Sequence, residues 1–429
     1  MGIRTVGTRT AVAASAVLAL ATSTAACSSN ASSSSSGSAG GGKVSLSYGV
    51  WDATQVPAMQ KIIAAFEAQN PAITVTIQQT PWADYWTKLQ AAASGGSAPD
   101  VFWMNGPNFQ LYAANNVLRP LTDTDPHPDT SVYPPALAKL YQYKNVQYGL
   151  PKDFDTVGLW YNKALFDAAG VAYPTASWTW SDFQAAAKKL TDPAKGVYGV
   201  GANLEGQENY YDTIYQAGGS VISPDGKKSG YADPATVAGL KFWTDLVAAK
   251  ESPSLKQMTD TAPLNLFESG KLAMYWGGSW DAKEFSGNDA TKNGVDVAPL
   301  PAGVKKATII HGLANVVFAH TSHPAQAEKF AAFLGSQQAA QIEADTGTVI
   351  PAYNGTQQSW VKAYPQYHLQ SFLDQLPDAV PYPISKNTAA WNTLETTELT
   401  KAWDGSEPID KAAGDLATAM NAALAKEGS

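Results

Sequence analysis

The pattern of apolar and polar positions after residue 43 predicts strands and helices in alternation. A first strand is predicted from four apolar residues that alternate with small or polar ones: Val44, Leu46, Tyr48 and Val50. A helix is then predicted from apolar residues at i, i+3, i+4 and i+7: Met59, Ile62, Ile63 and Phe66. A second alternation covers residues 73–77. Strand, helix and strand in this order are typical of a parallel sheet.

The same kind of pattern recurs along the rest of the chain. Short apolar runs at 101–104 and 158–161 indicate buried strands, and Thr179 with Asp182 three residues later indicates a helix start. The end of the chain is predicted to be helical over about 388–403 and 409–425. Residues 43–429 are too many for one core, so we expect an α/β protein with two domains.

The first 42 residues follow different rules. Arg4 and Arg9 precede an apolar stretch at 11–21, and small residues then lead to Cys27, the only cysteine of the chain. This arrangement is typical of a secretion signal, and it resembles a bacterial lipoprotein signal in which the thiol is acylated. Thr24 departs from that motif, which usually has Leu there. We expect a signal peptide at 1–27 ending at lipidated Cys27, and a Ser/Gly tether at 28–42. The alternative is an ordinary exported protein with a stray thiol.

Charge and motifs exclude several classes of function. The formal net charge is -8 and no Lys/Arg cluster occurs, which argues against a nucleic-acid surface. Without a cysteine after Cys27, the mature chain has no disulfide and no thiolate metal site. A phosphate-binding Gly loop followed by Lys-Ser/Thr, a G-x-S-x-G elbow and an H-E-x-x-H motif are all missing from the sequence. We therefore expect no cofactor and no metal.

Aromatic residues supply the positive evidence for a function. The chain has 13 Trp and 19 Tyr, and many of them lie beside short polar residues and turn formers. A sugar has flat C–H faces that stack on aromatic rings, and a rim of hydroxyls that Asp, Glu, Asn and Gln bind. The pattern favours a carbohydrate site, although core packing is the alternative for any single Trp.

Four segments carry a family resemblance, and they occur in family order across the mature chain: Gln147–Lys163, Pro99–Val101, Phe267–Met274 with the Trp280 loop, and Ala298–Gly303. They are similar to extracellular solute-binding proteins of the maltose-binding type. The resemblance implies two lobes, each a mostly parallel sheet flanked by helices, with the ligand cleft at the hinge. We expect lobe 1 to comprise 43–154 plus 300–335, and lobe 2 to comprise 155–299 plus 336–429.

The resemblance also implies a site at the carboxyl ends of the strands. Asp155 matches the family's acidic hydroxyl-binding residue, and Trp280 and Trp391 match tryptophans that stack on sugar rings. Glu208 and Tyr210 fall near a family Glu/Tyr pair. The full set of predicted ligand-binding residues is Trp51, Asp52, Trp82, Asn105, Asp155, Glu208, Tyr210, Trp280, His311 and Trp391. Trp103 is as suited to the core as to the site, and His311 and Asn315 lie where the chain re-enters the first lobe.

The function implied is capture of a sugar or oligosaccharide rather than catalysis. A monomer, held on the outer face of the cell membrane by its lipid anchor, would close on the ligand and deliver it to the permease of an ATP-driven (ABC) importer. Two alternatives stay open. A secreted glycan-active enzyme would need a carboxylate pair such as Asp155 and Glu208, and a polyamine or metal binder would need several convergent carboxylates and fewer tryptophans.

Overall fold

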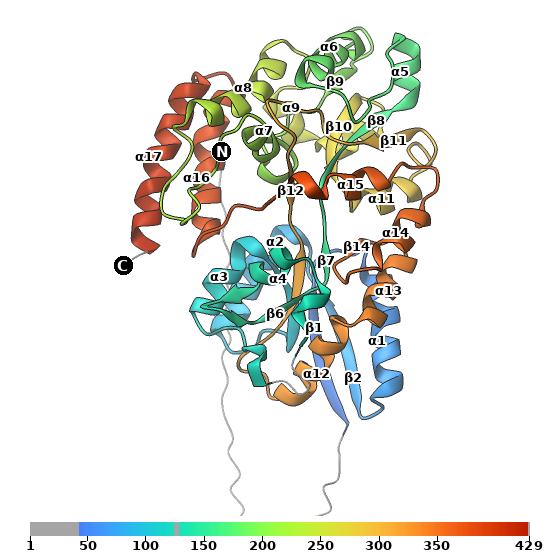
Figure 1. Ribbon diagram of the computed structural model, residues 1–429, viewed down its shortest axis with the longest axis vertical. Coiled ribbons are helices and arrows are strands. Elements are labelled where there is room, and N and C mark those ends of the chain that lie inside the picture. Colours follow the sequence, from blue (N-terminus) through green and yellow to red (C-terminus); the bar gives the residue numbers. More distant parts are fainter. Residues whose placement is uncertain (1–42, 124–127, 428–429) are drawn as a thin grey trace, which may run out of the picture. The chain divides into compact units, whose positions relative to one another are not determined.

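The computed structural model describes residues 43–123 and 128–427. The predicted signal peptide at 1–27, the lipidation site Cys27 and the tether at 28–42 lie outside the described residues. Over residues 44–114 strands and helices alternate, as the apolar pattern predicted, and later parts of the chain also contain runs of successive strands or successive helices (Figure 1). The strands form two principal sheets.

The first sheet has five strands in the order β2-β1-β3-β13-β6. These strands are β1 (Val44–Val50), β2 (Ile73–Gln79), β3 (Val101–Asn105), β6 (Gly149–Pro151) and β13 (Leu313–Val317). β1 pairs in parallel with β2 and β3, whereas β13 runs antiparallel to β3 and β6. The register joins Val44 to Ile73 and Val50 to Gln79, so the predicted strand–helix–strand unit is confirmed.

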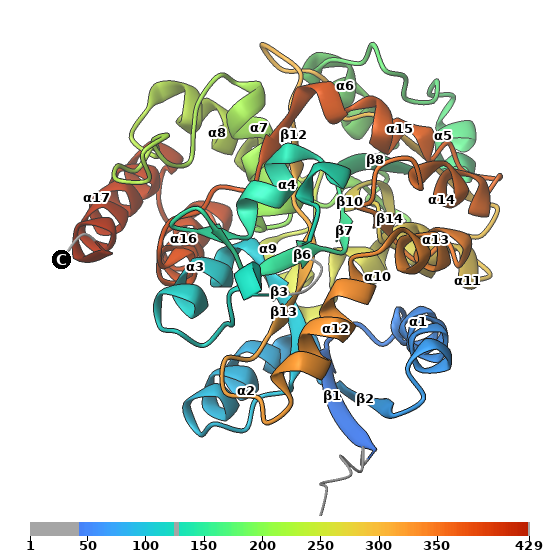
Figure 2. The same ribbon diagram turned by 60° about the horizontal axis from the view of Figure 1, so that its bottom comes forward.

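Different helices cover the two faces of this sheet, because successive strand residues point to opposite sides. Val101 and Trp103 pack in the core formed with α1 (Val56–Gln69), α12 (Pro324–Leu334) and α13 (Gln337–Asp345). Phe102 and Met104 pack in a separate core with α2 (Trp82–Ser94) and α3 (Gly106–Ala114). Figure 2 shows α1 and α2 on either side of these strands. The last residue of β3, Asn105, is also the N-cap of α3.

The second sheet has four strands in the order β11-β8-β10-β9. They are β8 (Val157–Asn162), β9 (Tyr198–Val200), β10 (Leu272–Gly278) and β11 (Val295–Ala298). β8 is antiparallel to both of its neighbours, β10 and β11, and β9 is parallel to β10. Three of the four strands, β9, β10 and β11, therefore run in the same direction and β8 alone runs against them, which agrees with the mostly parallel sheet predicted for this lobe. β8 enters directly from the first sheet, so no crossover helix of its own sheet requires a parallel direction.

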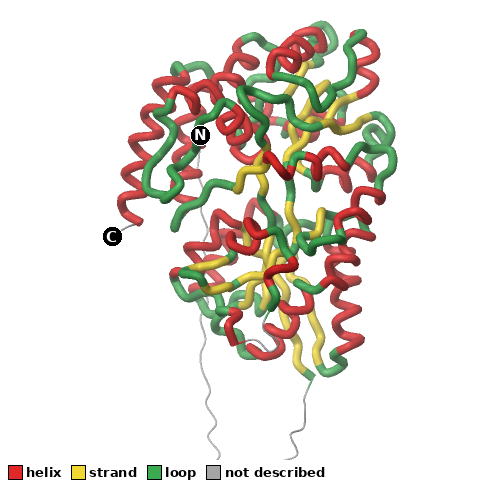
Figure 3. The backbone as a smooth tube through the Cα atoms, in the orientation of Figure 1, coloured by secondary structure: helices red, strands yellow, loops and turns green. Residues whose placement is uncertain are grey.

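Helices cover both faces of the second sheet as well (Figure 3). One face carries α5 (Lys163–Ala169), α6 (Trp180–Leu190), α7 (Tyr211–Gln216), α8 (Pro234–Ala248), α16 (Thr388–Trp403) and α17 (Ile409–Glu427). The other carries α10 (Pro263–Glu268), α11 (Asp281–Gly287) and α15 (Gln370–Asp374). The predicted capping box of α6 is confirmed, because Thr179 and Asp182 each bond the other's backbone N–H.

The chain passes between the sheets at three places. Residues 152–156 join β6 to β8 and contain β7 (Asp153–Phe154), which pairs with β14 (Ile350–Pro351). Residues 299–312 join β11 to β13 and contain β12 (Thr308–Ile310), which pairs with β15 (Ala379–Pro381). The third passage follows α14 (Gln357–Ala363). Because α13 packs against α1 and α12, these contacts favour placing residues 336–345 with the first sheet. The division into lobes by residue ranges stays a prediction.

Shorter elements complete the described chain. They are α4 (Pro135–Leu140), the β4–β5 hairpin (Gln142–Tyr143 and Val146–Gln147), α9 (Leu255–Asp260), the short helices η1 (Leu121–Asp123), η2 (Thr130–Val132) and η4 (Leu376–Asp378), and η3 (Gly206–Tyr210). η3 is a single turn of π-helix directly before α7. Such turns are often found at functional sites, and η3 lines the cavity described below.

Candidate functional site

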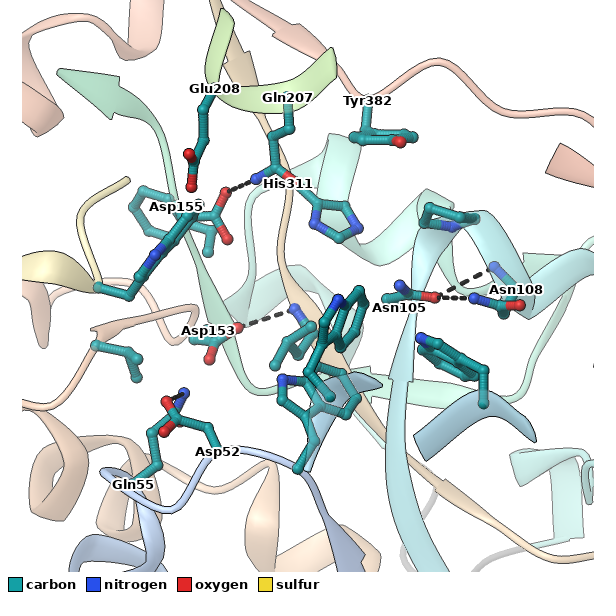
Figure 4. Close-up of a pocket in the computed structure, with 18 of the residues that line it drawn as sticks. Asp52, Gln55, Asn105, Asn108, Asp153, Asp155, Gln207, Glu208, His311 and Tyr382 are labelled. Carbon is teal, nitrogen blue, oxygen red and sulfur yellow. Dashed lines mark hydrogen bonds between the residues drawn. The ribbon is translucent and has the colours of Figure 1, made fainter. Parts of the chain in front are cut away.

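A cavity of about 970 Å³ lies at the carboxyl ends of strands from both sheets. Trp51 and Asp52 follow β1, Asn105 ends β3, and Trp280 follows β10. Residues 153–155 and His311, on two of the chain passages, line it between these strand ends (Figure 4). Open α/β sheets bind ligands in this position, since the loops after the strands converge there. The volume suits a ligand of several rings.

Eight of the ten predicted residues line this cavity: Trp51, Asp52, Trp82, Asn105, Asp155, Glu208, Trp280 and His311. They come from segments more than 250 positions apart in sequence, between residues 51 and 311. The fold therefore brings most of the predicted set together. That each of them contacts a ligand stays a prediction.

The other two predicted residues are buried and do not line the cavity, so the lining gives no support to their predicted role. Trp391 is fully buried, and its Nε1 donates to Ser385 Oγ at 2.9 Å. Tyr210 packs against Tyr211 and Trp403. Consecutive helix residues point about 100° apart, and on α16 it is the next residue, Asn392, that faces the cavity. Trp391 therefore cannot stack on a ligand in this conformation.

A group of aromatic rings lines the cavity on the side of the first sheet. The Trp51 ring lies at its centre, with ring centroids 5.3 Å from Trp82 and 5.8 Å from Trp86. The Trp82 side chain is 54% exposed, although the Trp51 and Trp86 side chains that contact it are half-buried. An exposed tryptophan beside a cavity offers a flat face for stacking. Trp103, by contrast, is fully buried and donates from Nε1 to Tyr48 Oη at 2.6 Å, so it belongs to the core.

Trp280 also lines the cavity, and it follows β10 of the second sheet. Its ring lies directly against the backbone of Gly278, since a Cβ at that glycine would come within 2.2 Å of the ring atoms. A glycine is therefore required at this close approach. The side chain is half-buried, which leaves part of it available to a ligand.

Several carboxyl groups line the same cavity as Trp280. Asp155 Oδ1 accepts a hydrogen bond of 2.7 Å from Gln207 Nε2 on η3. Burial, and after it the charge of Asp153, raises the pKa of Asp155 well above its usual value. Burial also raises the pKa of Glu208 well above its usual value, and the charges of Glu205 and Asp281 add to the effect. These carboxyl groups can bind the hydroxyl hydrogens of a ligand.

Asp153 has a different environment from Asp155. Its Oδ2 lies 2.7 Å from Lys152 Nζ, which also lies 2.9 Å from Glu343 Oε1 and 2.8 Å from Gln55 Oε1. All four side chains are buried. Burial alone would lower the pKa of Lys152, but the charges of Asp153 and Glu343 outweigh it and raise that pKa. The lysine therefore stays charged, and Asp153 belongs to a buried ion network beneath the cavity.

Metal and membrane features can be assessed for the described part of the chain alone. Within residues 43–123 and 128–427, no group of His, Asp and Glu side chains is arranged to hold a metal ion. Within the same ranges, no helix combines the length and apolarity needed to cross a membrane.

Several cavity residues were not found from the sequence: Gln55, Gln79, Trp86, Asn108, Gln207, Ser279, Tyr382 and Asn392. Gln207 adjoins Glu208 and Asn392 adjoins Trp391, so neighbourhood to a predicted residue was the available signal. Tyr382 directly follows β15, and its backbone N–H donates to Ile310 O at 3.0 Å, so its position depends on a pairing between distant segments. The amides extend the set of groups that can both donate and accept hydrogen bonds.

Comparisons with known proteins agree with this architecture. A family model described as bacterial extracellular solute-binding protein matches residues 52–341. An ABC substrate-binding protein from Listeria monocytogenes, solved in complex with cycloalternan, is 31% identical with a TM-score of 0.84, over 89% of this chain and 99% of that one. The GacH receptor of Streptomyces glaucescens, solved unliganded and with acarbose, is 23% identical with a TM-score of 0.80, over 89% and 98% of the two chains. A galactooligosaccharide-binding protein of Bacillus subtilis is 26% identical over 71% of this chain and 72% of its own length.

Proposed function

We propose that this chain, which belongs to the family of bacterial extracellular solute-binding proteins, captures a sugar or oligosaccharide outside the cell for an ATP-driven importer. Membership in the family confirms the resemblance inferred from the sequence, and the structural likeness confirms the two-lobed α/β fold. Solute-binding proteins are not enzymes. The proposal specifies the class of ligand, which is a sugar or an oligosaccharide.

The observation that carries the proposal is the pairing of tryptophan faces with carboxyl and amide groups around one cavity. Trp82 follows a strand of the first sheet and Trp280 follows a strand of the second, and both line the cavity together with Asp155 and Glu208. Stacking faces suit the C–H surface of a sugar ring, while the polar groups suit its hydroxyl rim. Relatives described as binding cycloalternan and galactooligosaccharides support a carbohydrate, and they leave its identity open.

The mechanism follows from where the lining residues come from. Trp51 and Asn105 follow strands of the first sheet, whereas Glu208 and Trp280 belong to the part of the chain that builds the second. A ligand that contacts both sets only when they are close together stabilises the closed arrangement. The importer then receives the ligand from the closed form. Asp155 lies on the first chain passage and lines the cavity, so its side chain can contact the ligand while its backbone forms part of the hinge.

A thermal-shift screen tests the ligand class. The panel contains cycloalternan, maltotriose, galactooligosaccharides, diacetylchitobiose, acarbose and, as a non-sugar, spermidine. A carbohydrate at about one hundred times its Kd should stabilise the protein by about 2.7 kcal/mol and raise Tm. Tryptophan fluorescence should change with the same sugar. A response to spermidine alone would instead favour the polyamine alternative.

A glycan-active enzyme is the second candidate, and one observation favours it. The raised pKa values of Asp155 and Glu208 resemble those of carboxylic acids that donate protons to a leaving group. Incubation of the protein with the same sugars, followed by chromatography of the products, separates the two functions. Unchanged sugars would support binding, and cleavage that disappears in Glu208→Gln would support catalysis.

Membrane anchoring through Cys27 is part of the proposal. Cys27 is the only thiol of the chain and follows a short apolar stretch and small residues. Cys27→Ser should release the protein into the medium, since the acyl chains that hold it would be lost. Cell-bound mutant protein at the wild-type level would contradict the anchor without affecting the ligand proposal.

A further inference from the structure

Two neighbouring residues of the cavity wall share one feature, a contact with the start of α3. Asn105 ends β3 and His311 precedes β13, so they come from segments that are far apart in the sequence. Both side chains line the cavity, and they are only 4% and 6% exposed. Their hydrogen bonds to the first turn of α3 determine which of their polar atoms remain for a ligand.

The protonation state of His311 follows from one backbone bond. The N–H of Gly106 donates to His311 Nε2 at 3.2 Å. Because a backbone N–H can only donate, Nε2 carries no proton. Burial lowers the pKa of His311 to about 4, so the ring is neutral at physiological pH. A neutral imidazole has one proton, which therefore lies on Nδ1.

Asn105 is oriented in the same way. Its Oδ1 accepts from the backbone N–H of Asn108 at 3.2 Å and from Asn108 Nδ2 at 2.9 Å. Only the oxygen can face that backbone N–H, so the amide NH₂ is the group on the other side. Figure 4 shows both bonds leading from the Asn105 oxygen toward Asn108. The capping of α3 thus fixes the direction of the amide.

Gly106 favours the arrangement. A Cβ at this position would lie 3.3 Å from His311 Nε2 and 3.2 Å from Leu140 Cδ1, which is tighter than most Cβ contacts, so the imidazole or the leucine would have to shift by a few tenths of an ångström. The glycine lets the imidazole approach the backbone N–H closely. The orientation of His311 is therefore built into the turn between β3 and α3.

The two remaining donors have no hydrogen-bond partner within residues 43–123 and 128–427. His311 Nδ1–H and the Asn105 NH₂ are the groups concerned, and both belong to residues of the cavity lining. A donor that is nearly buried and unpaired is costly unless solvent or a ligand accepts its bond. We infer that Asn105 and His311 form a donor pair that binds an acceptor oxygen of the carbohydrate.

The inference rests on the proposed function and makes it more specific. Asp155 and Glu208 supply carboxyl groups to the cavity, whereas Asn105 and His311 present only N–H groups. A ligand that satisfies the donor pair must place there an oxygen with free lone pairs, such as a hydroxyl or an acetamide carbonyl. The need to place an oxygen at this point fixes the orientation of the ligand in the cavity. An ammonium group at the same point would meet only N–H donors and would not be bound there.

Asn105→Asp separates the donor role from the structural role. Aspartate keeps the oxygen that caps α3 and caps helices as well as asparagine does, so folding and Tm should be retained. The amide donors are lost, and affinity for cycloalternan, or for maltotriose if wild type prefers it, should fall about tenfold or more. His311→Met should act alike without a charge, because its thioether sulfur is a weak acceptor that can take the place of Nε2, whereas methionine has no donor to replace the Nδ1–H.

Asn162→Asp is the matched control. Asn162 is also an N-cap, since its Oδ1 accepts from the N–H of Leu165 at 3.1 Å, and it does not line the cavity. The same chemical change there should leave the affinity at the wild-type level. A comparable loss in Asn162→Asp would mean that the added charge, rather than the missing donor, weakens binding, and this would overturn the inference.

A spectroscopic measurement examines the tautomer directly. Long-range ¹H–¹⁵N spectra of protein labelled at its five histidines show which ring nitrogen carries the proton, and His311→Gln identifies the resonance. The expected result near pH 7 is a neutral ring protonated at Nδ1, whose proton resonance shifts when sugar is added. An Nε2–H tautomer, or a resonance unmoved by saturating sugar, would overturn the donor pair.

Wild-type protein that binds no carbohydrate of the panel would overturn the proposed function and this inference together. Wild-type binding that Asn105→Asp and His311→Met leave unchanged would overturn the donor pair alone.

Discussion

Two carboxylates that are two residues apart show how the same chemical group serves two purposes in this protein. Asp153 and Asp155 both lie on the first passage between the sheets, and both line the cavity. Asp153 is paired with the charged Lys152 and accepts the backbone N–H of Leu313 at 2.8 Å. Asp155 has the neutral amide of Gln207 as its side-chain partner. The comparison indicates that the first holds the passage together and the second is available to a ligand.

The physical basis of this difference is charge compensation. A buried carboxylate is expensive unless a cation or several donors stabilise it, and an uncompensated one shifts its pKa upward. Lys152 is the cation that compensates the charges of Asp153 and Glu343. No Lys or Arg is among the described residues that line the cavity around Asp155. Ligand hydroxyls can supply the hydrogen bonds that Asp155 lacks. We therefore expect ligand binding to offset part of the cost of burying the Asp155 carboxyl group.

The largest effect is expected where the compensation is removed. Lys152→Met would leave Asp153 and Glu343 buried without their cation, which typically costs about 3–5 kcal/mol of unfolding free energy. We expect a strongly lowered Tm by calorimetry, with or without sugar. Lys241→Met is the control, since its pair with Asp245 is exposed and contributes about 0.5 kcal/mol or less. Equal Tm values for the two variants would show that the ion network does not hold the passage.

Asp155→Asn should affect binding and spare the fold. Asparagine keeps an oxygen for Gln207 but loses the charge, and hydrogen bonds to charged groups contribute about 1.5–3 kcal/mol. Titration calorimetry with the preferred sugar should show that loss, while the Tm of the sugar-free protein should not fall below the wild-type value. A collapse of that Tm would assign Asp155 to the same structural role as Asp153.

Two tryptophans extend the comparison to the aromatic residues. Trp280→Ala removes one stacking face and should cost about 1–3 kcal/mol of binding free energy, measured by tryptophan fluorescence or calorimetry. Trp391→Ala should leave an internal cavity instead, and lower the stability by about 3–5 kcal/mol. Unchanged sugar affinity in Trp280→Ala would remove Trp280 from the site, and an unchanged Tm in Trp391→Ala would contradict its place in the core.

The smallest effects are expected in the pH dependence of stability, where Asp155 and His311 should have opposite signs. The raised pKa of Asp155 means that the folded protein binds the extra proton above the ordinary pKa, so its contribution to stability falls as the pH rises. The lowered pKa of His311, about 4, means that the unfolded chain binds the extra proton between about 4 and 6.5, so its contribution falls as the pH drops.

Differences from wild type isolate these two groups. Relative to wild type, Asp155→Asn should gain stability as the pH is raised, and His311→Gln should gain as the pH is lowered from about 6.5. Each difference is at most about 1.4 kcal/mol per pH unit. Tm measured from pH 5 to 8 in sugar-free protein tests both. Slopes of the same sign would mean that one of the two burial effects is misassigned.

Local patterns in the sequence determined much of what this protein is. Alternation and helical periodicity predicted β1, α1 and β2, and the last two helices, because these elements bury one side of a regular repeat. The family resemblance supplied most of the ten predicted ligand-binding residues, and eight of the ten line the cavity. Trp51 and Asp52 were also expected there because they directly follow the first strand, and parallel strands end at one edge of a sheet. Family landmarks added the two-lobed fold and the solute-binding class.

Long-range packing decided the rest. The sequence could not show that Asn392 rather than Trp391 faces the cavity, because the rotation of α16 depends on what it packs against. It could not pair Lys152 with Glu343, nor place Gly106 against His311, 205 positions away. A periodic pattern records only that a side is buried or exposed. Which charge is neutralised, and which hydrogen bond donor is left for a ligand, depends on contacts between distant segments that exist only in the folded chain.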